Sequence, residues 1–282
     1  MKHVLIASMM AAGVALALVC FATAPASLAA GQAAQRGAAA TAPENAAPKP
    51  APRMTDGHPD LSGVWWGGSD IGGNRGAGGG RGARGGARGA PAPSFTSLYQ
   101  PWAAEKAKTL SDKDDPTLKC IPTAFGTLNV SLWSVGAVGQ IISTPKFVVM
   151  LTETFHAFQL IPADGRPHRD DVPPAYRGDS VGHWEDDTFV VDTTNFTDNT
   201  WMFAEGRVSF HSDALHIVER YRRVDANTLE VEARIEDPKV LTGPWTAPKQ
   251  TLVLAPFDQI MSLACSGLET QVLMEGAAKQ NK

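Results

Sequence analysis

The stretch Thr228-Leu-Glu-Val-Glu-Ala-Arg-Ile-Glu236 decides the fold class of this chain. Its apolar residues Leu229, Val231, Ala233 and Ile235 alternate with the charged residues Glu230, Glu232, Arg234 and Glu236. Successive side chains of a β-strand point to opposite faces, so one face of this strand is buried and the other meets water. This pattern is typical of antiparallel sheets, because parallel strands are usually buried on both faces.

Further strands lie on both sides of this one along the chain. We predict strands at Leu61–Trp66, Gln140–Ser143, Phe147–Thr152, Phe155–Ile161, Val181–Glu185, Thr188–Thr194, Leu215–Val224 and Gln250–Leu254. Turn signals such as Asp186-Asp187 join several of them. The one predicted helix, Pro101–Leu110, is short, and the absence of long amphipathic helices between strands excludes doubly wound α/β folds. The sequence therefore predicts an all-β antiparallel barrel of roughly eight or nine strands, since closure removes exposed strand edges.

The N-terminus has the three parts of a Sec-type signal peptide: a positive charge at Lys2, an apolar run from Val4 to Ala24, and a small-residue exit. Ser27-Leu28-Ala29 predicts cleavage after Ala29, which makes residues 1–29 the signal peptide. An uncleaved membrane anchor is the alternative, because the run approaches the ~20 residues that span a bilayer. The small-residue exit favours cleavage, so we expect a periplasmic or secreted protein without stable membrane insertion.

The mature chain divides by composition. Residues 30–55 are rich in Ala, Gln and Pro and predict a disordered linker, and residues 56–282 predict a single barrel domain. Within that domain, residues 67–92 are dominated by Gly with interspersed Arg. Such repeats indicate RNA binding inside a cell, but in an exported chain they predict a disordered loop between two strands. The formal net charge of −4 also gives no indication of a nucleic-acid partner.

Two cysteines, Cys120 and Cys265, remain after cleavage. In an oxidising compartment an even pair favours a disulfide, although two unrelated buried thiols are the alternative. Neither cysteine has a second one at metal-ligand spacing, so a sulfur-based zinc site is not predicted.

Several motifs together resemble a group of secreted bacterial lipocalin-like proteins. They are Asp60-Leu-Ser-Gly-Val-Trp65, Asp164-Gly-Arg-Pro-His168, Trp184-Glu-Asp-Asp-Thr-Phe-Val-Val-Asp-Thr193, Ser212-Asp-Ala-Leu-His216 with Glu219-Arg220, and Glu236-Asp-Pro238 leading to Pro244-Trp-Thr246. The resemblance implies a single lipocalin-like (calycin-type) barrel and almost no specific chemistry. Members of the group usually have Gly at the position of Asp186. Both mature cysteines lie where such proteins have theirs, which supports the predicted bridge.

A G-x-S-x-G pattern occurs at Gly178-Asp-Ser-Val-Gly182. In α/β-hydrolases this motif works because a strand–turn–helix elbow exposes the serine. Here Pro173-Pro174 precedes it and a hairpin strand follows, so neither flank fits. We therefore predict that Ser180 forms hydrogen bonds at the start of a strand, where it can also contact a ligand, and that it is not a nucleophile.

Titratable side chains gather in the second half of the chain. In a regular strand over Leu215–Val224, Glu219 and Tyr221 share the more apolar face and should point inward, while His216 points outward. His211 has the same parity as Glu219, and His156 lies in a segment that is apolar on both faces. A buried carboxylate needs a partner or a proton. Glu219 with His211 and His156 is therefore the candidate acid–base group.

The remaining candidate ligand contacts lie at the barrel rim or in its lumen. Arg166 and His168 follow the Asp164-Gly165 turn and belong at the rim, where they can line a pocket. Trp184, Trp201 and Tyr221 are expected in the core, or around an aromatic ligand cavity if the lumen is open. Trp65 and Trp245 are expected to fill the core or close the barrel end.

Three functions are compatible with this chain. The first is binding of a small apolar or aromatic molecule in the lumen, without a cofactor. The second is a cofactor-independent lyase, isomerase or hydrolase that uses Glu219 and a histidine. The third is an envelope-associated interaction domain. Metal binding by His156, His211 and Glu219 is a further alternative, but the spacing of these residues does not require it, so no metal site is predicted. Fold alone does not choose between these functions.

Overall fold

A computed structural model describes residues 48–67, 93–124, 138–153, 155, 157–202 and 209–261. The predicted signal peptide, most of the predicted linker and nearly all of the Gly/Arg loop lie outside these residues. His156 and Cys265 also lie outside them, so the structure does not test the role predicted for either.

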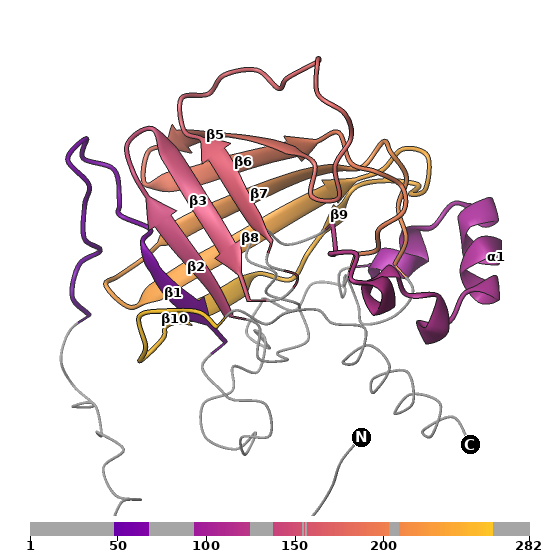
Figure 1. The fold of residues 1–282 in the computed structure, drawn as a ribbon, viewed down its shortest axis with the longest axis horizontal. Coiled ribbons are helices and arrows are strands. Elements are labelled where there is room, and N and C mark those ends of the chain that lie inside the picture. The colour runs from indigo at the N-terminus through magenta and orange to yellow at the C-terminus, as the bar shows by residue number, and fades with distance from the viewer. Residues whose placement is uncertain are drawn as a thin grey trace, which may run out of the picture. The chain divides into compact units, whose positions relative to one another are not determined.

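Ten strands form one antiparallel sheet (Figure 1). They are β1 (Gly63–Trp66), β2 (Val138–Ser143), β3 (Phe147–Thr152), β4 (Phe158–Pro162), β5 (Asp179–Glu185), β6 (Thr188–Thr194), β7 (His216–Arg223), β8 (Thr228–Glu236), β9 (Trp245–Thr246) and β10 (Gln250–Leu254). Nine of them follow the order β4-β3-β2-β1-β10-β8-β7-β6-β5, and β9 pairs with β8. The first strand, β1, lies between β2 and the last strand, β10.

The two ends of this sheet, β4 and β5, approach each other and nearly close a barrel. The backbone N–H of Gly165, just after β4, donates to the carbonyl of Gly182 in β5 over 2.9 Å. A Cβ at Gly182 would lie 2.3 Å from Cζ of Phe189 on β6 and 3.1 Å from Cγ2 of Ile161 on β4, so glycine leaves room for these two side chains at the junction. We call this junction the seam. The predicted nearly closed antiparallel barrel of about eight or nine strands is confirmed.

The barrel interior follows the alternation of the sequence. In β7, Ile217, Glu219 and Tyr221 are buried, with exposures of 1%, 4% and 1%, and in β8 Leu229, Ala233 and Ile235 are buried. The inward direction predicted for Glu219 is therefore confirmed. His216 points outward, to a carboxylate on β6, as its parity predicts.

One hydrophobic cluster fills the barrel near β1. Leu61 and Trp65 are fully buried there, and the indole N–H of Trp65 donates to the carbonyl of Leu61 over 3.0 Å. Cluster members from the other strands are Ile141, Val148, Met150, Ile161, Phe189, Val191, Tyr221, Leu229 and Leu252. The cluster thus takes apolar side chains from eight strands, β1 to β4, β6 to β8 and β10.

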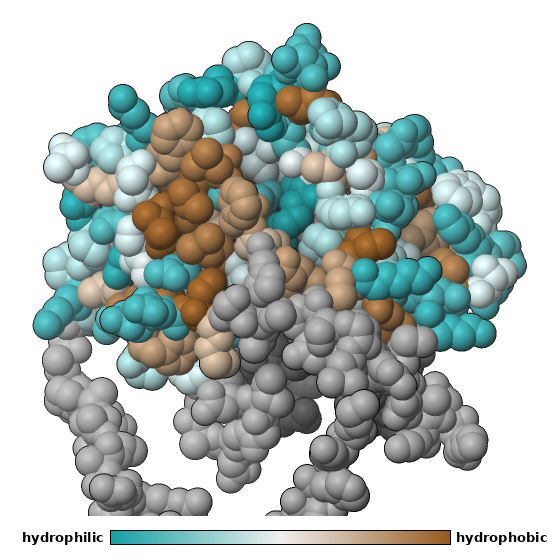
Figure 2. All heavy atoms as spheres, in the orientation of Figure 1, coloured by the Kyte–Doolittle hydropathy of each residue, from teal (hydrophilic) through white to brown (hydrophobic). Residues whose placement is uncertain are grey.

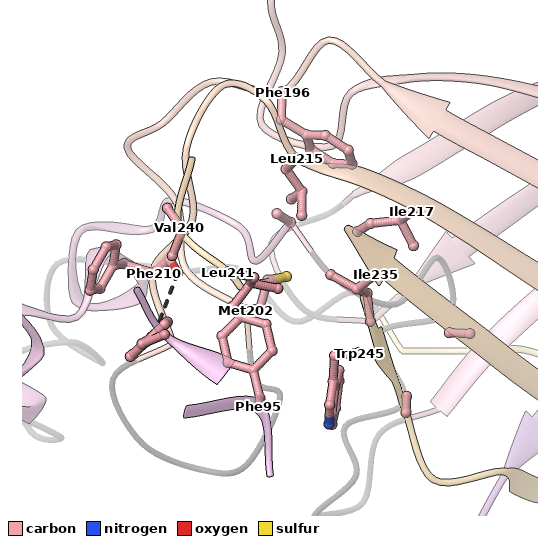
Figure 3. Close-up of a cluster of buried hydrophobic side chains, with 14 of the residues drawn as sticks. Phe95, Phe196, Met202, Phe210, Leu215, Ile217, Ile235, Val240, Leu241 and Trp245 are labelled. Atoms are coloured by element: carbon pink, nitrogen blue, oxygen red, sulfur yellow. Dashed lines mark hydrogen bonds between the residues drawn. The ribbon is translucent and has the colours of Figure 1, made fainter. Parts of the chain in front are cut away.

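A second cluster covers the other end of β7 and β8 (Figure 3). Phe95 of the 3-10 helix η1 (Phe95–Leu98) packs edge-on against Trp245, with ring centroids 5.3 Å apart. Ala103 anchors helix α1 (Pro101–Thr109) in the same cluster, and Trp102 donates its indole N–H to the carbonyl of Lys239. The predicted short helix is therefore present and covers this barrel end. Two 3-10 turns, η2 (Asp112–Asp114) and η3 (Pro116–Lys119), follow it.

The described helices are α1 and three 3-10 turns, and no helix in these ranges has the length and apolar character needed to cross a bilayer.

The end of the predicted linker differs from the prediction. Pro48 to Thr55 lie against the barrel: the N–H of Ala226 donates to the carbonyl of Lys49, and Arg53 forms two hydrogen bonds of 2.8 Å with the carboxylate of Asp187. Composition could not show this, because the contacts are backbone hydrogen bonds and an ion pair and not burial of apolar residues. The ordered domain thus begins near Pro48.

Candidate ligand-binding cleft

A cleft of about 520 Å³ opens along the seam between β4 and β5. Strands β4 and β5 form two of its sides, and the connection between them forms a third. The lining residues are Pro122, Phe147, Phe158, Gln159, Leu160, Pro162, Arg166, Pro167, Arg169, Ala175, Tyr176, Arg177, Gly178, Asp179, Ser180 and Val181. Its volume lies within the roughly 300–1,000 Å³ of small-molecule sites.

The β4 side of the cleft is apolar and unusually open to solvent. Phe158 and Leu160 are 67% and 54% exposed. Side chains alternate along a strand, so these two point outward while Gln159 and Ile161 point inward. Ile142 on β2 is exposed on the same side of the sheet. Figure 2 shows hydrophobic side chains gathered on the face that β2 and β3 present in Figure 1. An outward sheet face is normally polar, so packing of the core does not explain why these apolar side chains are exposed.

The connection from β4 to β5 supplies charged side chains that are already paired. Arg166 donates two hydrogen bonds, of 2.9 and 2.7 Å, to the carboxylate of Asp164, which holds the pKa of Asp164 at about 2. Arg169 pairs with Asp179, whose carboxylate accepts its Nε–H over 2.8 Å. Burial alone would raise the pKa of Asp179, but hydrogen bonds from Arg169 and His168 hold it below its ordinary value. These two arginines thus bring no uncompensated charge to the cleft.

Gly178 sets the close approach of β5 to its neighbour. Its φ is +67°, and a Cβ there would lie 2.4 Å from the carbonyl oxygen of Thr194. Only glycine fits both the left-handed backbone and the available space. Arg177 and Asp179, on either side of this turn in the chain, both line the cleft.

The floor of the cleft is a row of polar side chains across the seam. Gln159 Nε2 donates to the carbonyl of Arg177 over 3.1 Å and to Ser180 Oγ over 2.9 Å. Ser180 Oγ also lies 2.9 Å from Thr193 Oγ1 of β6. The predicted hydrogen-bonding role of Ser180 at the start of a strand is therefore confirmed. We call Gln159, Ser180 and Thr193 the polar floor.

Beneath the polar floor lies a buried charged layer. Arg177 is only 8% exposed, and its Nη2 donates to Gln159 Oε1 over 3.2 Å. Burial lowers the pKa of Arg177, while the nearby carboxylate of Glu219 acts to raise it. The phenol of Tyr221 donates to Glu219 Oε1 over 3.0 Å. Glu219 thus has a hydrogen-bond donor and a buried cation as partners, as a carboxylate in a barrel interior requires.

His211 does not share these surroundings. Its Nδ1 lies 2.8 Å from the carbonyl of Ser212 and its Nε2 lies 2.6 Å from Thr200 Oγ1. A carbonyl can only accept, so Nδ1 carries the proton and Nε2 accepts from the threonine hydroxyl. Both nitrogens of the neutral ring are thereby used. The structure does not bring His211 and Glu219 together as an acid–base pair, because strand parity fixes direction and not position along the barrel.

The neutral state of His211 predicts a pH dependence. Burial lowers the pKa of this imidazole, so the unfolded chain takes up its proton first as pH falls below ~6.5. We expect the unfolding free energy of the wild type to fall relative to His211→Asn between pH 7 and pH 5 in urea titrations. A stability difference that stays constant or widens as pH falls would contradict the neutral assignment.

His168 belongs to a second network, on the outside of the barrel. Its Nδ1 lies 3.3 Å from Asp179 Oδ2 and its Nε2 lies 2.8 Å from Asp192 Oδ1. Asp192 also contacts His216 Nε2, over 3.0 Å. His168 therefore links the β4–β5 connection, which forms one side of the cleft, to β5 and β6. Arg166, the other predicted rim residue, lines the cleft directly. Within the described ranges, no three His, Cys, Asp or Glu side chains are arranged to hold a metal ion.

The remaining predicted residues lie in packed positions. Trp184 contacts Phe189 and stacks on His58, with centroids 4.7 Å apart and planes 11° apart. Trp201 packs against the cluster around Phe95, and Tyr221 belongs to the cluster around Trp65. Of the residues predicted as ligand contacts, only Arg166 and Ser180 line the cleft.

Cys120 ends η3 in a left-handed conformation and is disulfide-bonded. Its expected partner, Cys265, lies outside the described residues, so the pairing of these two cysteines stays a prediction.

Sequence reasoning missed most of the cleft. Phe158, Leu160, Tyr176, Arg177 and Gln159 were not among the candidates. The one available signal was in β4, where Phe158 and Leu160 lie on one face of the strand and the polar residue Gln159 lies on the other. The alternation does not tell which face is inside, because Phe158 and Leu160 on one face and Ile161 on the other are all apolar and could each belong to a core.

Comparison of the chain with protein-family models, with curated proteins and with solved structures gave no match.

Proposed function

We propose that this protein binds a small, uncharged apolar or aromatic molecule in the seam cleft. The observation that carries the proposal is the exposure of Phe158 and Leu160 along the edge of a 520 Å³ cleft. Large apolar side chains gathered at one concave place mark a contact surface, because their burial by a ligand releases ordered water.

The described interior favours the cleft over the lumen as the binding place. Two hydrophobic clusters and the charged layer between them occupy inward positions along β7 and β8. On the side of this interior the cleft is lined by Gln159 and Ser180, which meet at the polar floor, and by Arg177. A ligand would therefore lie with its apolar body against β4 and one end at the seam.

The arrangement of charge supports an uncharged ligand. Arg166 and Arg169, the cationic side chains at the rim, already have Asp164 and Asp179 as partners. A charged ligand would have to compete with these pairs and lose its hydration shell in an apolar wall, which is costly. For an exported chain, such ligands would be apolar molecules met in the periplasm or outside the cell.

Binding of the neutral fluorophore N-phenyl-1-naphthylamine tests the proposal. We expect saturable fluorescence enhancement with the wild type and a loss of affinity of about tenfold or more for Leu160→Asp. Burial of a leucine side chain is worth ~1.5–3 kcal/mol, and ~1.4 kcal/mol corresponds to tenfold in Kd.

Ile142→Asp is the matched control. Ile142 is 44% exposed and lies on the same side of the sheet, but it does not line the cleft. Its substitution should leave the affinity unchanged. Equal affinities of wild type and Leu160→Asp, or absence of saturable binding to the wild type, would refute binding in this cleft.

A further inference from the structure

We infer that the ligand presents an uncharged hydrogen-bond acceptor, such as a ketone or ether oxygen, to the hydroxyl of Ser180. This inference rests on the proposed binding of an apolar molecule in the seam cleft and names the chemical class of that molecule. It follows from the donors and acceptors of the polar floor.

The orientation of the Gln159 amide is fixed by its neighbours. Arg177 can only donate, so the atom it contacts, over 3.2 Å, is the carbonyl Oε1. Nε2 then points the other way and has two hydrogens, which go to the carbonyl of Arg177 and to Ser180 Oγ. Gln159 therefore gives Ser180 a hydrogen bond and has no N–H left for a ligand.

Thr193 determines the direction of the second bond. Its side chain is 3% exposed, and Ser180 Oγ is the hydrogen-bond partner of its hydroxyl within the described residues. A buried hydroxyl hydrogen needs an acceptor, and donation to Ser180 Oγ over 2.9 Å supplies it. If the bond ran in the opposite direction, the Thr193 hydrogen would be buried without an acceptor, at a free-energy cost.

These two bonds use both lone pairs of Ser180 Oγ, since a hydroxyl oxygen accepts two hydrogen bonds. The Ser180 hydrogen is then the one polar group of the floor that has no acceptor in the described part of the chain. Ser180 lines the cleft, so this hydrogen is available to an oxygen of the ligand.

Charge distinguishes between the acceptors that could satisfy this hydrogen. A carboxylate would accept well, but it would bring a full charge into a cleft with an apolar β4 wall, whose rim cations Arg166 and Arg169 are already paired. A neutral carbonyl or ether oxygen satisfies the hydroxyl without that desolvation cost.

Three naphthalenes of nearly equal shape test the inference: 2-acetylnaphthalene, 2-isopropylnaphthalene and 2-naphthoate. Each is titrated against the complex with N-phenyl-1-naphthylamine to obtain a Kd. We expect Ser180→Ala to raise the Kd of 2-acetylnaphthalene about fivefold while leaving that of 2-isopropylnaphthalene unchanged, since one neutral hydrogen bond is lost. We also expect 2-naphthoate to bind more weakly than the ketone.

Thr193→Val is the matched variant. It removes the hydroxyl that donates to Ser180 but keeps the Ser180 hydrogen, so the preference for 2-acetylnaphthalene should remain. Unchanged affinity of Ser180→Ala for N-phenyl-1-naphthylamine, which has no oxygen, shows that the cleft of that variant is intact.

The outcomes separate the two proposals. If all the neutral probes bind and depend on Leu160, but Ser180→Ala affects ketone and hydrocarbon equally, the inference is wrong and cleft binding stands. The inference is also wrong if 2-naphthoate binds more tightly than the ketone. If neither neutral probe nor the fluorophore binds the wild type, both proposals fail.

Discussion

Replacement of Glu219 by glutamine is expected to lower the free energy of unfolding by about 3 kcal/mol, although the change is nearly isosteric. Glutamine keeps an oxygen that can accept from the Tyr221 phenol, so that hydrogen bond of 3.0 Å survives. The negative charge facing the Arg177 guanidinium does not survive. Arg177 is 8% exposed, and a buried cation that loses its counter-charge is strongly destabilising.

Urea unfolding of wild type, Glu219→Gln, Arg177→Met and the double variant measures this effect. Because the loss comes from an uncompensated charge, the double variant should be more stable than either single variant. A single Glu219→Gln variant within ~0.5 kcal/mol of wild type would show that the charged layer contributes little. The same variant also tests the acid–base hypothesis, since turnover of any substrate that survives Glu219→Gln removes Glu219 from proton transfer.

Replacement of Asp237 by alanine is expected to cost about 4 kcal/mol of unfolding free energy. Asp237 is 2% exposed, and its carboxylate accepts the N–H and the hydroxyl of Ser212 over 2.6 and 2.7 Å. It also accepts the N–H groups of Lys239 and Val240. Alanine leaves the N–H and hydroxyl of Ser212, in the segment before β7, without this acceptor, while the N–H of Val240 keeps the backbone carbonyl of residue 237. Each buried donor left without an acceptor costs roughly 1–3 kcal/mol.

Asp213→Ala provides the control for this prediction. Asp213 lies next to Ser212, is 62% exposed, and pairs over 2.6 Å with Lys239 of the β8–β9 loop. A solvent-exposed ion pair contributes little to stability, so this variant should have the same unfolding temperature as the wild type. Equal stability of Asp237→Ala and Asp213→Ala in thermal unfolding would contradict the assigned role of Asp237.

The strand pattern is largely readable in the sequence. Phe147–Thr152, Thr188–Thr194, Thr228–Glu236 and Gln250–Leu254 are strands with the predicted bounds. Period-two alternation and turn residues suffice here, because each strand has one buried and one wet face. The fourth predicted strand is different: it was expected from Phe155, but β4 begins at Phe158 because Phe155 has a left-handed backbone with φ of 61°.

The candidate site was much less readable. Parity correctly placed Glu219 inside, and the Gly178-Asp-Ser-Val-Gly182 context correctly placed Ser180 in a hydrogen-bonding role. Which strands end the sheet is a property of the pairing order, in which β1 joins β2 to β10. The cleft exists only because β4 and β5 end that order, so no local pattern in Phe158 or Leu160 could reveal it.

The position of β1 has a consequence for how the molecule is made. Trp65 pairs with Leu254, and the N–H of Ala255 donates to the carbonyl of Val64 over 2.8 Å. During synthesis β1 is made before β10, so the sheet becomes continuous only after β10 has been made and has paired with β1. Pairing across such a sequence separation is slow, because the chain loses much entropy before contacts compensate. Late closure of the sheet would suit the export that the N-terminus predicts, because a chain that has not yet closed its sheet remains competent for translocation.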